Sequence, residues 1–428
     1  MPPPLRLGIA GLGTVGAGVV RIVRRKADLL ARRAGRPVTI TAVSARSRDK
    51  DRGVNIAAYD WEDDPVALAR RDDVDVLVEL MGGSDGPAKA ATEAAIASGK
   101  DVVTANKAML AHHGQALAEA AEAAGRVLRF EAAVAGGIPV VKALTEGLAG
   151  NDVIRVMGVM NGTCNYILTR MQAGGLPYEE VFEEARQLGF LEADPTLDVG
   201  GIDAGHKLAL LAAIAFGAQV NFAAVELEGI ERITIEDIRH AADMGYRIKL
   251  LGVAQMTGRG LEQRMSPCLV PADSPLGQLE GGTNMVVLEG DQVERIVLSG
   301  PGAGAGPTAS AVIGDVVDIA RGVRFAAFGI PTAALTRANP ARTATPAPYY
   351  LRLLLDDKPG ALARVASVLG EAGISINRMR QYRHEDRTAP VLIVTHRTTR
   401  DALDLALGGM AGLDVVASTP VALRIEAV

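Results

Sequence analysis

The chain has 428 residues, 48% of them hydrophobic but only 4% aromatic, so we expect two to four domains with largely aliphatic cores. Its 45 Lys and Arg residues nearly balance 50 Asp and Glu residues, which argues against a nucleic-acid partner because no strong basic stripe results. With two cysteines, no leader-like N-terminus and no apolar run of about 18 residues, we expect a cytoplasmic protein without disulfides or a membrane partner.

The chain opens with a predicted strand, Leu5 to Ala10, followed at once by a glycine-rich turn and a helix. The turn has G-x-G-x-x-G spacing, and its residues are Gly11, Leu12, Gly13, Thr14, Val15 and Gly16. The first glycine permits a tight turn, the second lets a pyrophosphate approach the backbone, and the third lets helix and strand pack closely. Since a second strand follows, we predict a Rossmann-like α/β domain that binds a dinucleotide. The alternative is a glycine-rich turn without a ligand.

The end of the second strand, Val38 to Ser44, bears on which dinucleotide binds. NAD-binding domains carry an acidic residue there for the ribose 2′-hydroxyl, but the first acidic residue after this strand is Asp49. Arg46 is instead suited to a 2′-phosphate, which favours NADP(H). NAD(H) stays the alternative, because arginines that follow strands are commonly just solvated.

Two further predicted strands end in groups that a ligand could meet. The run Val74 to Leu80 is followed by a glycine-containing polar turn, and the run that starts at Asp101 ends in Asn106 and Lys107. Because the carboxyl ends of parallel strands share one edge of the sheet, Lys107 is expected beside the cofactor turn. The alternative is a solvent-exposed lysine.

The run from residue 192 to residue 207 is the most informative stretch. It brings the carboxylates of Glu192, Asp198 and Asp203 together with Lys207. Proline and glycine residues predict a non-helical first part, and the apolar run after Lys207 predicts a buried helix. Asp203 and Lys207 are four residues apart, so they share one helix face. Such a set suits a small substrate with a cationic group and a polar oxygen; the alternative is a helix cap with one solvated ion pair.

A second domain follows the first, which spans residues 1–134. Residues 135–300 mix short strands and helices, so we predict an α+β domain that holds the substrate. Within it, Asn161, Gly162 and Thr163 are expected on a turn after a strand, where they could bind a substrate carboxylate. A plain turn is the alternative.

The chain then returns to the first domain and ends in a separate module. Segment 301–331 carries Gly302 and Gly304 ahead of a buried helix, and its backbone could approach a nicotinamide ring or form a flexible hinge. A stretch rich in Pro, Ala and Thr at 332–348 predicts a linker. The order strand, helix, strand, strand, helix, strand over 349–428 predicts a ferredoxin-like βαββαβ unit.

Taken together, these motifs resemble those of homoserine dehydrogenases along essentially the whole chain. The matching runs are G-L-G-T-V-G at 11–16, V-T-A-N-K at 103–107, A-G-G-I-P at 135–139, N-G-T-C-N-Y-I-L at 161–168, the acidic run at 192–207 and G-A-G-A-G-P-T-A at 302–309. The loop from Asp356 to Leu362 resembles that of ACT-type regulatory domains, in which such a loop binds an amino acid at a dimer interface.

The resemblance implies a reaction and its regulation. The reaction is the reversible NAD(P)H-dependent reduction of L-aspartate 4-semialdehyde to L-homoserine, in the biosynthesis of threonine, methionine and isoleucine. Threonine is the implied effector of the ACT-type domain, and oligomerisation alone is that domain's alternative role. The middle domain would also dimerise, so a homodimer or homotetramer is implied.

The resemblance also assigns residues to the substrate. Lys107 and Lys207 would lie at the reacting centre, with Lys107 contacting the cofactor as well. Glu192 and Asp203 would bind the amino group and the hydroxyl of the substrate, with Asp198 beside them.

Further residues are implied around the cofactor and a cation. Gly189 would border the cofactor. A sodium-type cation would be held by Glu131 and by the carbonyls of Val134, Gly136 and Ile138. The alternative for the glutamate is a capping group in a glycine-rich turn.

The chemistry of aldehyde reduction suits these residues. Hydride transfer belongs to the cofactor, and the resulting alkoxide must be protonated. A lysine buried near a second cation suits proton donation, because that setting lowers a lysine's pKa toward neutrality. We expect Lys207 to donate the proton, Lys107 to polarise the carbonyl, and Asp203 to orient Lys207 or accept the substrate amine.

Two rival interpretations use the same sequence. Another semialdehyde dehydrogenase, one that phosphorylates its substrate, would need a nucleophilic cysteine with a histidine partner. Cys164 has no evident histidine for that role, and the six histidines, which show no metal spacing, are assigned no role. A non-catalytic sensor of nucleotide and amino acid is disfavoured because Lys107, Asp203 and Lys207 are all present.

Overall fold

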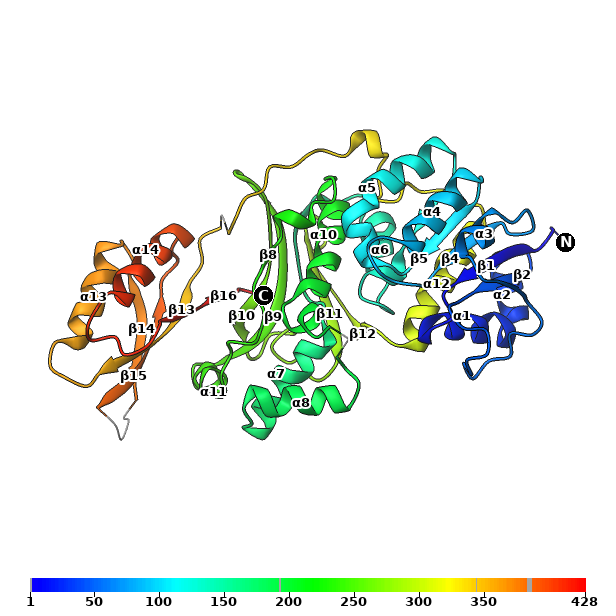
Figure 1. Cartoon of the computed structure of the whole chain (residues 1–428). Helices are drawn as coiled ribbons and strands as arrows, with labels where there is room; N and C mark the ends of the chain where they lie inside the picture. Colours follow the sequence, from blue (N-terminus) through cyan, green and yellow to red (C-terminus); the bar gives the residue numbers. More distant parts are fainter. Residues whose placement is uncertain (1, 192–193, 344, 383–386) are drawn as a thin grey trace.

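The structure, a computed structural model, describes residues 2–191, 194–343, 345–382 and 387–428. Three parts follow one another along the molecule in Figure 1: a domain built on a parallel sheet, a middle domain built on a long antiparallel sheet, and a C-terminal module. Glu192, a predicted substrate ligand, lies outside the described residues. Within those ranges, no helix is both long and apolar enough to cross a membrane.

The first domain contains a six-stranded parallel sheet in the order β3-β2-β1-β4-β5-β6. Its strands are β1 (Leu5–Ala10), β2 (Val38–Ser44), β3 (Asp60–Glu62), β4 (Val76–Glu79), β5 (Asp101–Thr104) and β6 (Leu128–Arg129). The strand order reverses between β1 and β4. In open parallel sheets, a ligand binds at the carboxyl ends of the strands that flank such a reversal.

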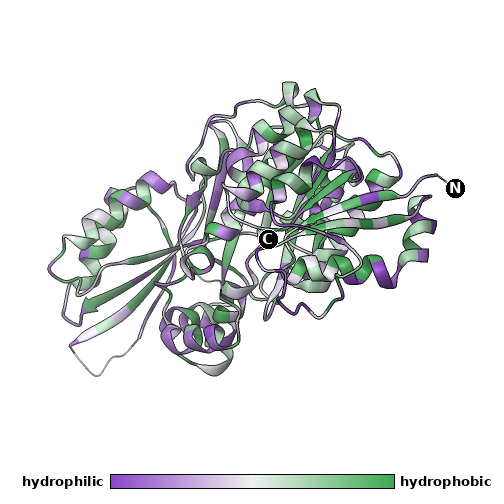
Figure 2. Ribbon diagram, turned by 45° about the vertical axis from the view of Figure 1, so that its right-hand side comes forward, coloured by the Kyte–Doolittle hydropathy of each residue, from purple (hydrophilic) through white to green (hydrophobic). Residues whose placement is uncertain are grey.

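Helices cover both faces of this sheet. They are α1 (Thr14–Arg25), α2 (Ala27–Ala34), α3 (Pro65–Arg70), α4 (Pro87–Ala97) and α5 (Lys107–Ala123). Val76 and Val78 pack in the core with α1 and α2, whereas Leu77 packs in the core with α3, α4 and α5, because successive strand residues point to opposite faces. The strands are accordingly mostly hydrophobic in Figure 2.

The predicted return to the first domain is present as helix α12 (Ala305–Ala320). It packs on α1 so closely that a Cβ added at Gly18 would lie 2.5 Å from the carbonyl oxygen of Ala305. The helix begins at Ala305, directly after Gly304 of the glycine-rich run.

The middle domain is built on an antiparallel sheet. Its strands lie in the order β12-β11-β7-β9-β10, with β8 paired to β10. They are β7 (Val153–Val159), β8 (Glu226–Leu227), β9 (Tyr246–Thr257), β10 (Gly260–Pro271), β11 (Thr283–Gly290) and β12 (Glu294–Pro301).

Helices pack on this sheet and connect it to the first domain. They are α6 (Val140–Lys142), α7 (Gly162–Gly174), α8 (Tyr178–Gln187), α9 (Thr196–Val199), α10 (Ile202–Phe216) and α11 (Ile235–Asp243), with 3₁₀ turns at Glu131–Ala133 and Phe222–Ala224 and a π-turn at Ala143–Gly147. Helix α10 contacts both β9 and α5. It therefore lies between the middle sheet and the first domain, which is where its buried apolar sequence belongs.

The C-terminal module has the predicted βαββαβ order. Its elements are β13 (Tyr349–Asp356), α13 (Ala361–Glu371), β14 (Ile376–Gln381), β15 (Thr388–Thr395), α14 (Arg400–Ala411) and β16 (Val421–Ile425). The sequence predicts a last strand over residues 415–425. The first half of that prediction is wrong, because the strand begins only at Val421. Pro420 has no backbone N–H to donate, so regular pairing begins only at Val421.

The C-terminal module shares a sheet with the middle domain, which the sequence does not predict. Strand β16 pairs in parallel with β10, with Cys268 opposite Arg424 and Leu269 opposite Ile425. Together with β8, the strands of the two parts form one ten-stranded sheet. Backbone hydrogen bonds therefore join the two parts directly.

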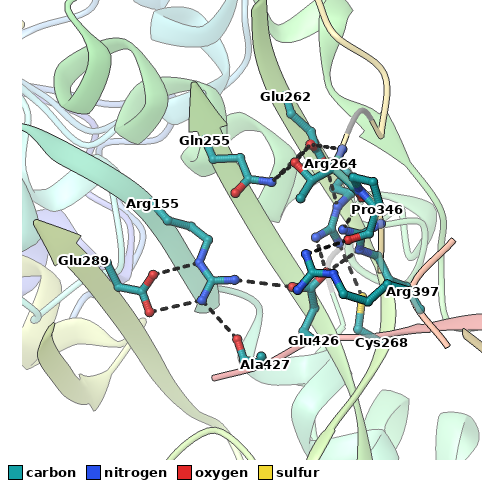
Figure 3. A network of polar contacts seen from close by, with 12 residues as sticks. Arg155, Gln255, Glu262, Arg264, Cys268, Glu289, Pro346, Arg397, Glu426 and Ala427 are labelled. Atoms are coloured by element: carbon teal, nitrogen blue, oxygen red, sulfur yellow. Dashed lines mark hydrogen bonds and ion pairs between the residues drawn. The ribbon is translucent and has the colours of Figure 1, made fainter. Parts of the chain in front are cut away.

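A buried ionic network reinforces this junction (Figure 3). Both Arg264 and Arg424 donate to the carboxylate of Glu426, just beyond β16. Arg155 on β7 lies 3.5 Å from the same carboxylate and also pairs with Glu289 at 2.9 Å. The network thus links the C-terminal strand to β7.

The predicted linker at 332–348 packs along the middle domain. It begins with a 3₁₀ turn at Thr332–Ala334. Gln219 N donates to the Thr336 carbonyl at 2.9 Å, and Leu261 N donates to the Asn339 carbonyl at 2.9 Å. These backbone bonds fix its path.

Candidate active site

The three residues predicted to be catalytic meet at one carboxylate. Lys107 Nζ lies 3.0 Å from Asp203 Oδ1, and Lys207 Nζ lies 2.6 Å from Asp203 Oδ2. Two ammonium groups from distant segments therefore share the two oxygens of a single side chain. All three residues line one cleft of about 1040 Å³.

Local structure explains how these groups converge. Lys107 is the first residue of α5, which Asn106 caps by accepting a hydrogen bond from Met109 N at 3.0 Å. Gly201, with φ of +80°, turns the chain into α10. Asp203 then lies in the first turn of α10 and Lys207 one turn later, the spacing that brings side chains together on a helix face.

The electrostatics of Asp203 make it a fixed anion. Its side chain is buried, with 7% exposure. Burial on its own raises the pKa of a carboxyl group, but the charges of Lys207 and Lys107 outweigh burial and hold the pKa of Asp203 well below its usual value. The ionised carboxylate therefore positions both ammonium groups at neutral pH.

The end of β7 supplies a second set of partners. Lys207 Nζ donates to the carbonyl oxygen of Met160 at 2.8 Å. Asn161 Nδ2 donates to Asp198 Oδ1 at 2.8 Å and to Asp203 Oδ2 at 3.2 Å. The predicted substrate residues Asn161 and Asp198 are thus brought into contact with the lysine–aspartate centre.

Two local predictions for these residues are wrong. The sequence places residues 161–163 on a turn, but the Asn161 side chain caps α7 by accepting from Cys164 N at 2.8 Å, and Gly162 starts the helix. The segment around Pro195 is predicted to be non-helical, yet Thr196–Val199 forms α9. Pro195 has φ of −61°, a value that suits a helix start rather than a break.

The start of α7 offers donors to an anion. Gly162 and Thr163 lie in the first turn of this 13-residue helix and line the cleft. The N–H groups of a first helical turn lack intrahelical partners. Because the helix dipole is positive at this end, a carboxylate is favoured here.

The glycine-rich turn has the geometry of a pyrophosphate site. Gly11 has φ of +102°, and a Cβ there would lie 2.6 Å from the Leu80 backbone. A Cβ at Gly16 would lie 2.1 Å from the Gly11 carbonyl oxygen, whereas one at Gly13 would meet nothing within 4 Å. The backbone is therefore tightly packed at the first and third glycines, and there is space for a ligand beside the second. Helix α1 starts here without a side-chain cap.

Other predicted cofactor residues divide into two sets. Val15, Gly189, Gly302 and Gly304 line the same cleft as the lysines, whereas Arg46 is exposed beyond the end of β2. Leu12 and Thr14 belong to the glycine-rich turn and its helix. Arg52, a residue that the sequence does not single out, reaches this turn and donates to the Leu12 carbonyl at 3.2 Å.

The predicted cation residues form a tight loop behind the cleft. Glu131 caps α6, because its carboxylate oxygens accept from Val141 N and Lys142 N, each at 2.9 Å. Burial and the nearby charge of Asp315 raise the pKa of Glu131 to about 7. Gly136 alone of the predicted cation residues lines the cleft.

Comparisons with known proteins agree with this geometry. The homoserine dehydrogenase family matches residues 139–317, its NAD binding domain matches residues 11–131, and the ACT domain matches residues 349–408. The homoserine dehydrogenase of Neisseria gonorrhoeae is 42% identical, and that of Bacillus subtilis 38% identical; each alignment spans 99% of this chain and 99% or 98% of the relative. The chain belongs to the homoserine dehydrogenase family.

Solved structures of homoserine dehydrogenases extend the comparison. The one from Thiobacillus denitrificans superposes with a TM-score of 0.93 at 39% identity, over 99% of this chain and 98% of that one. A hyperthermophilic archaeal homoserine dehydrogenase in complex with NADPH superposes with a TM-score of 0.63 at 26% identity, over 74% of this chain and 97% of that one. The chain is an NAD(P)-dependent oxidoreductase with homoserine dehydrogenase and ACT domains.

This homoserine dehydrogenase has two cleft histidines that the sequence does not single out. His206 and His112 lie with ring centroids 5.5 Å apart, and His206 packs on Phe222 at 4.3 Å. Burial, and secondarily the charge of His112, lower the pKa of His206 to about 4. Their positions in the sequence could have indicated that both histidines lie in the cleft. His206 directly precedes Lys207, and His112 follows Lys107 by five residues on α5.

Cys164 has a structural position in this homoserine dehydrogenase. Its thiol is fully buried and donates to the Asp198 carbonyl oxygen at 3.2 Å. Burial, with the nearby charges of Asp198 and Asp203, raises the pKa of Cys164 well above its usual value. A neutral, buried thiol is a poor nucleophile, so the rival chemistry through Cys164 is disfavoured.

Proposed function

We propose that Lys107, Asp203 and Lys207 form the reacting centre for the reversible reduction of L-aspartate 4-semialdehyde to L-homoserine, a step in threonine, methionine and isoleucine biosynthesis. The observation that carries this proposal is the shared carboxylate, with one ammonium group on each oxygen. The nicotinamide cofactor supplies the hydride when bound. The side chains of the cleft then have to polarise an aldehyde and deliver one proton to its oxygen.

Lys207 is the proposed proton donor. Its Nζ is held by Asp203 Oδ2 and by the Met160 carbonyl, which leaves its third N–H for the substrate oxygen. Lys107, whose side chain is 32% exposed, lies on the cofactor-turn side and polarises the carbonyl. Asp203 orients both lysines. It is poorly suited to take the substrate amine as well, because each of its oxygens already meets an ammonium group.

The two ends of the substrate find complementary groups. Asp198, which lines the cleft, supplies a carboxylate for the α-ammonium group. Glu192, six residues earlier in the sequence, is the proposed second carboxylate. The first turn of α7, at Gly162 and Thr163, supplies N–H donors for the α-carboxylate. The hydroxyl or aldehyde end then points toward the lysines.

We propose NADP(H) as the preferred cofactor, with the phosphates on the turn from Gly11 to Gly16. Support comes from Arg46, which is exposed just beyond the end of β2, since arginine matches a 2′-phosphate. Gly189, Gly302 and Gly304 border the remainder of the dinucleotide. Steady-state kinetics with NADPH and NADH decide the preference; equal or better kcat/KM with NADH would overturn it.

We propose a sodium-type cation at Glu131 and the carbonyls of Val134, Gly136 and Ile138. The loop suits a cation, because two consecutive residues are left-handed, Ala135 with φ of +53° and Gly136 with φ of +55°, and this changes the direction of the loop's carbonyl groups. The carboxyl groups of Glu131 and Asp315 are buried at the start of the loop. A bound cation would raise the melting temperature in sodium chloride above that in choline chloride at equal ionic strength. Equal melting temperatures would refute the site.

We propose that threonine binds the ACT-type domain and lowers activity, and that the chain acts as a homodimer or homotetramer through residues 135–300. One continuous sheet connects residues 349–428 to β7, so a structural change on effector binding has a direct route to the cleft. Rates measured with and without threonine on the full chain test the effector, and light scattering tests the assembly. The full chain is needed because removal of β16 would expose the edge of β10 and deprive Arg264 of Glu426.

The reacting centre is tested by Lys207→Ala. Loss of a general acid lowers turnover by about 100-fold or more, measured as cofactor reduction with L-homoserine. Lys89→Ala is the matched control, since Lys89 pairs with Glu93 on α4 and does not line the cleft. Normal turnover in a folded Lys207→Ala enzyme would overturn the proposed centre.

A further inference from the structure

Asn284 carries a buried side-chain amide in the cleft. It is the second residue of β11, is 1% exposed and lines the same cleft as the two lysines. Neither its Nδ2 nor its Oδ1 has a hydrogen-bond partner among the described residues. Neither the sequence motifs nor the proposed mechanism uses this residue.

The sheet register fixes where this amide lies. Asn284 pairs with Gly300 on β12, and its neighbour Met285 pairs with Val159 on β7. Asn284 therefore lies between the end of β7, whose next residue holds Lys207, and the glycine-rich run after β12. A Cβ added at Gly302 would lie 2.0 Å from Asn284 Nδ2, so the amide packs directly against the backbone of that run.

The energetic cost of this arrangement points to a ligand. A buried donor or acceptor without a partner costs about 1–3 kcal/mol, so an unpaired amide that lines a cleft calls for a partner, which a bound ligand can supply. Asn165 shows the ordinary alternative. It is also 1% exposed, but it donates to the Gly281 carbonyl at 2.8 Å and accepts from Lys249 at 2.9 Å.

We propose that the Asn284 side chain binds the carboxamide of the nicotinamide ring and so sets which ring face meets the substrate. A primary amide presents one acceptor and two donors, which complement another primary amide. The charged ends of the substrate already have charged partners, so a neutral amide is left for a neutral group. This inference rests on the proposed path of the cofactor past Gly302.

The test is Asn284→Leu, which keeps the side-chain volume and removes both polar atoms. Binding of NADPH weakens by about 10-fold or more, because the lost hydrogen bonds carry that much free energy. Binding of 2′-phospho-ADP-ribose, which has no nicotinamide ring, is unchanged. The melting temperature of the ligand-free protein stays level or rises, since an unpaired buried amide is removed.

Asn165→Leu is the matched control, because it removes an amide that is fully paired. It lowers the melting temperature and does not distinguish NADPH from the ring-free fragment. The inference is overturned if Asn284→Leu weakens both ligands equally, if it alters only the KM of the semialdehyde, or if it behaves as the control does. The affinities for NADPH and for the ring-free fragment are binding measurements, so they remain decisive even if Lys207→Ala disproves the proposed reacting centre.

Discussion

Replacing Asp203 by Asn removes the one anion that both lysines share. The change keeps the size of the side chain but leaves two ammonium groups facing a neutral amide. The Lys207 side chain is 10% exposed and that of Asp203 is 7% exposed, so their pair is a buried one. Removing one partner of a buried pair costs about 3–5 kcal/mol. The Lys107 pair adds about 1 kcal/mol at most, because solvent screens its 32% exposed side chain.

The effect on catalysis follows from the same geometry. With Asp203→Asn, both ammonium groups lose their shared anionic partner, so turnover falls by about 100-fold or more, the scale of a lost acid–base group. Denaturant unfolding measures the stability change, and steady-state oxidation of L-homoserine measures turnover. Glu183→Gln is the control, since Glu183 forms an exposed pair with Arg186 on α8.

The pH dependence adds a sign that can be checked. Because the pKa of Asp203 is lowered in the folded enzyme, its stabilising contribution is present above the unfolded value of about 3.9 and is lost as pH falls through the folded pKa. Asp203→Asn removes that dependence. A variant with wild-type turnover and less than about 1 kcal/mol of destabilisation would refute the view that this carboxylate organises the site.

Three further predictions concern other buried groups. Cys164→Ser keeps turnover within about tenfold, since a hydroxyl can donate to Asp198 in place of the thiol; near-complete loss of activity would restore a nucleophilic role. The pKa of His206 is lowered to about 4 in the folded protein, so its contribution to folding stability is full above about pH 6.5 and is lost as pH falls toward 4. His206→Gln should therefore reduce the fall in melting temperature between pH 7 and pH 5. An unchanged slope would contradict this. Glu426→Gln should lower the unfolding free energy by about 3 kcal/mol, because Arg264 is 2% exposed and pairs with that carboxylate. The same substitution should weaken any effect of threonine on the rate. Unchanged stability would mean that the ionic network does not stabilise the contact between the C-terminal module and the middle domain.

The placements within the cleft that the sequence predicts depend on local or periodic geometry. Asp203 and Lys207 are four residues apart, so a helix brings them together wherever that helix lies. Lys107 follows a strand of a parallel sheet, and such strand ends share one edge. Strand bounds such as Leu5–Ala10 and Val38–Ser44 were likewise predictable, because buried parallel strands are continuous apolar runs.

The parts that the sequence does not predict depend on contacts between distant segments. Strand β10 carries Glu262, Gln263 and Arg264 at buried positions, so its apolar pattern is interrupted. Glu262 and Arg264 can be buried because the linker and Glu426 supply their partners from far along the chain. The local sequence pattern therefore does not predict that β16 pairs with β10, nor that the sheet is continuous.

Asn284 shows the same limit within the cleft. Nothing near it in sequence distinguishes it from Asn151 or Asn221, which lie in turns. Its interest arises only from register, which sets it between β7 and β12, and from the lack of a partner for its buried amide within the described residues.

The central claim is that the two lysines act as one unit on a single aldehyde. A double-mutant cycle of Lys107→Ala and Lys207→Ala, measured as kcat/KM with L-homoserine, tests it most directly. If the lysines act together, the double variant loses little more than the worse single variant, because either change already disables the centre. Losses that add in free energy across the cycle would mean that the two ammonium groups act independently and would contradict the account.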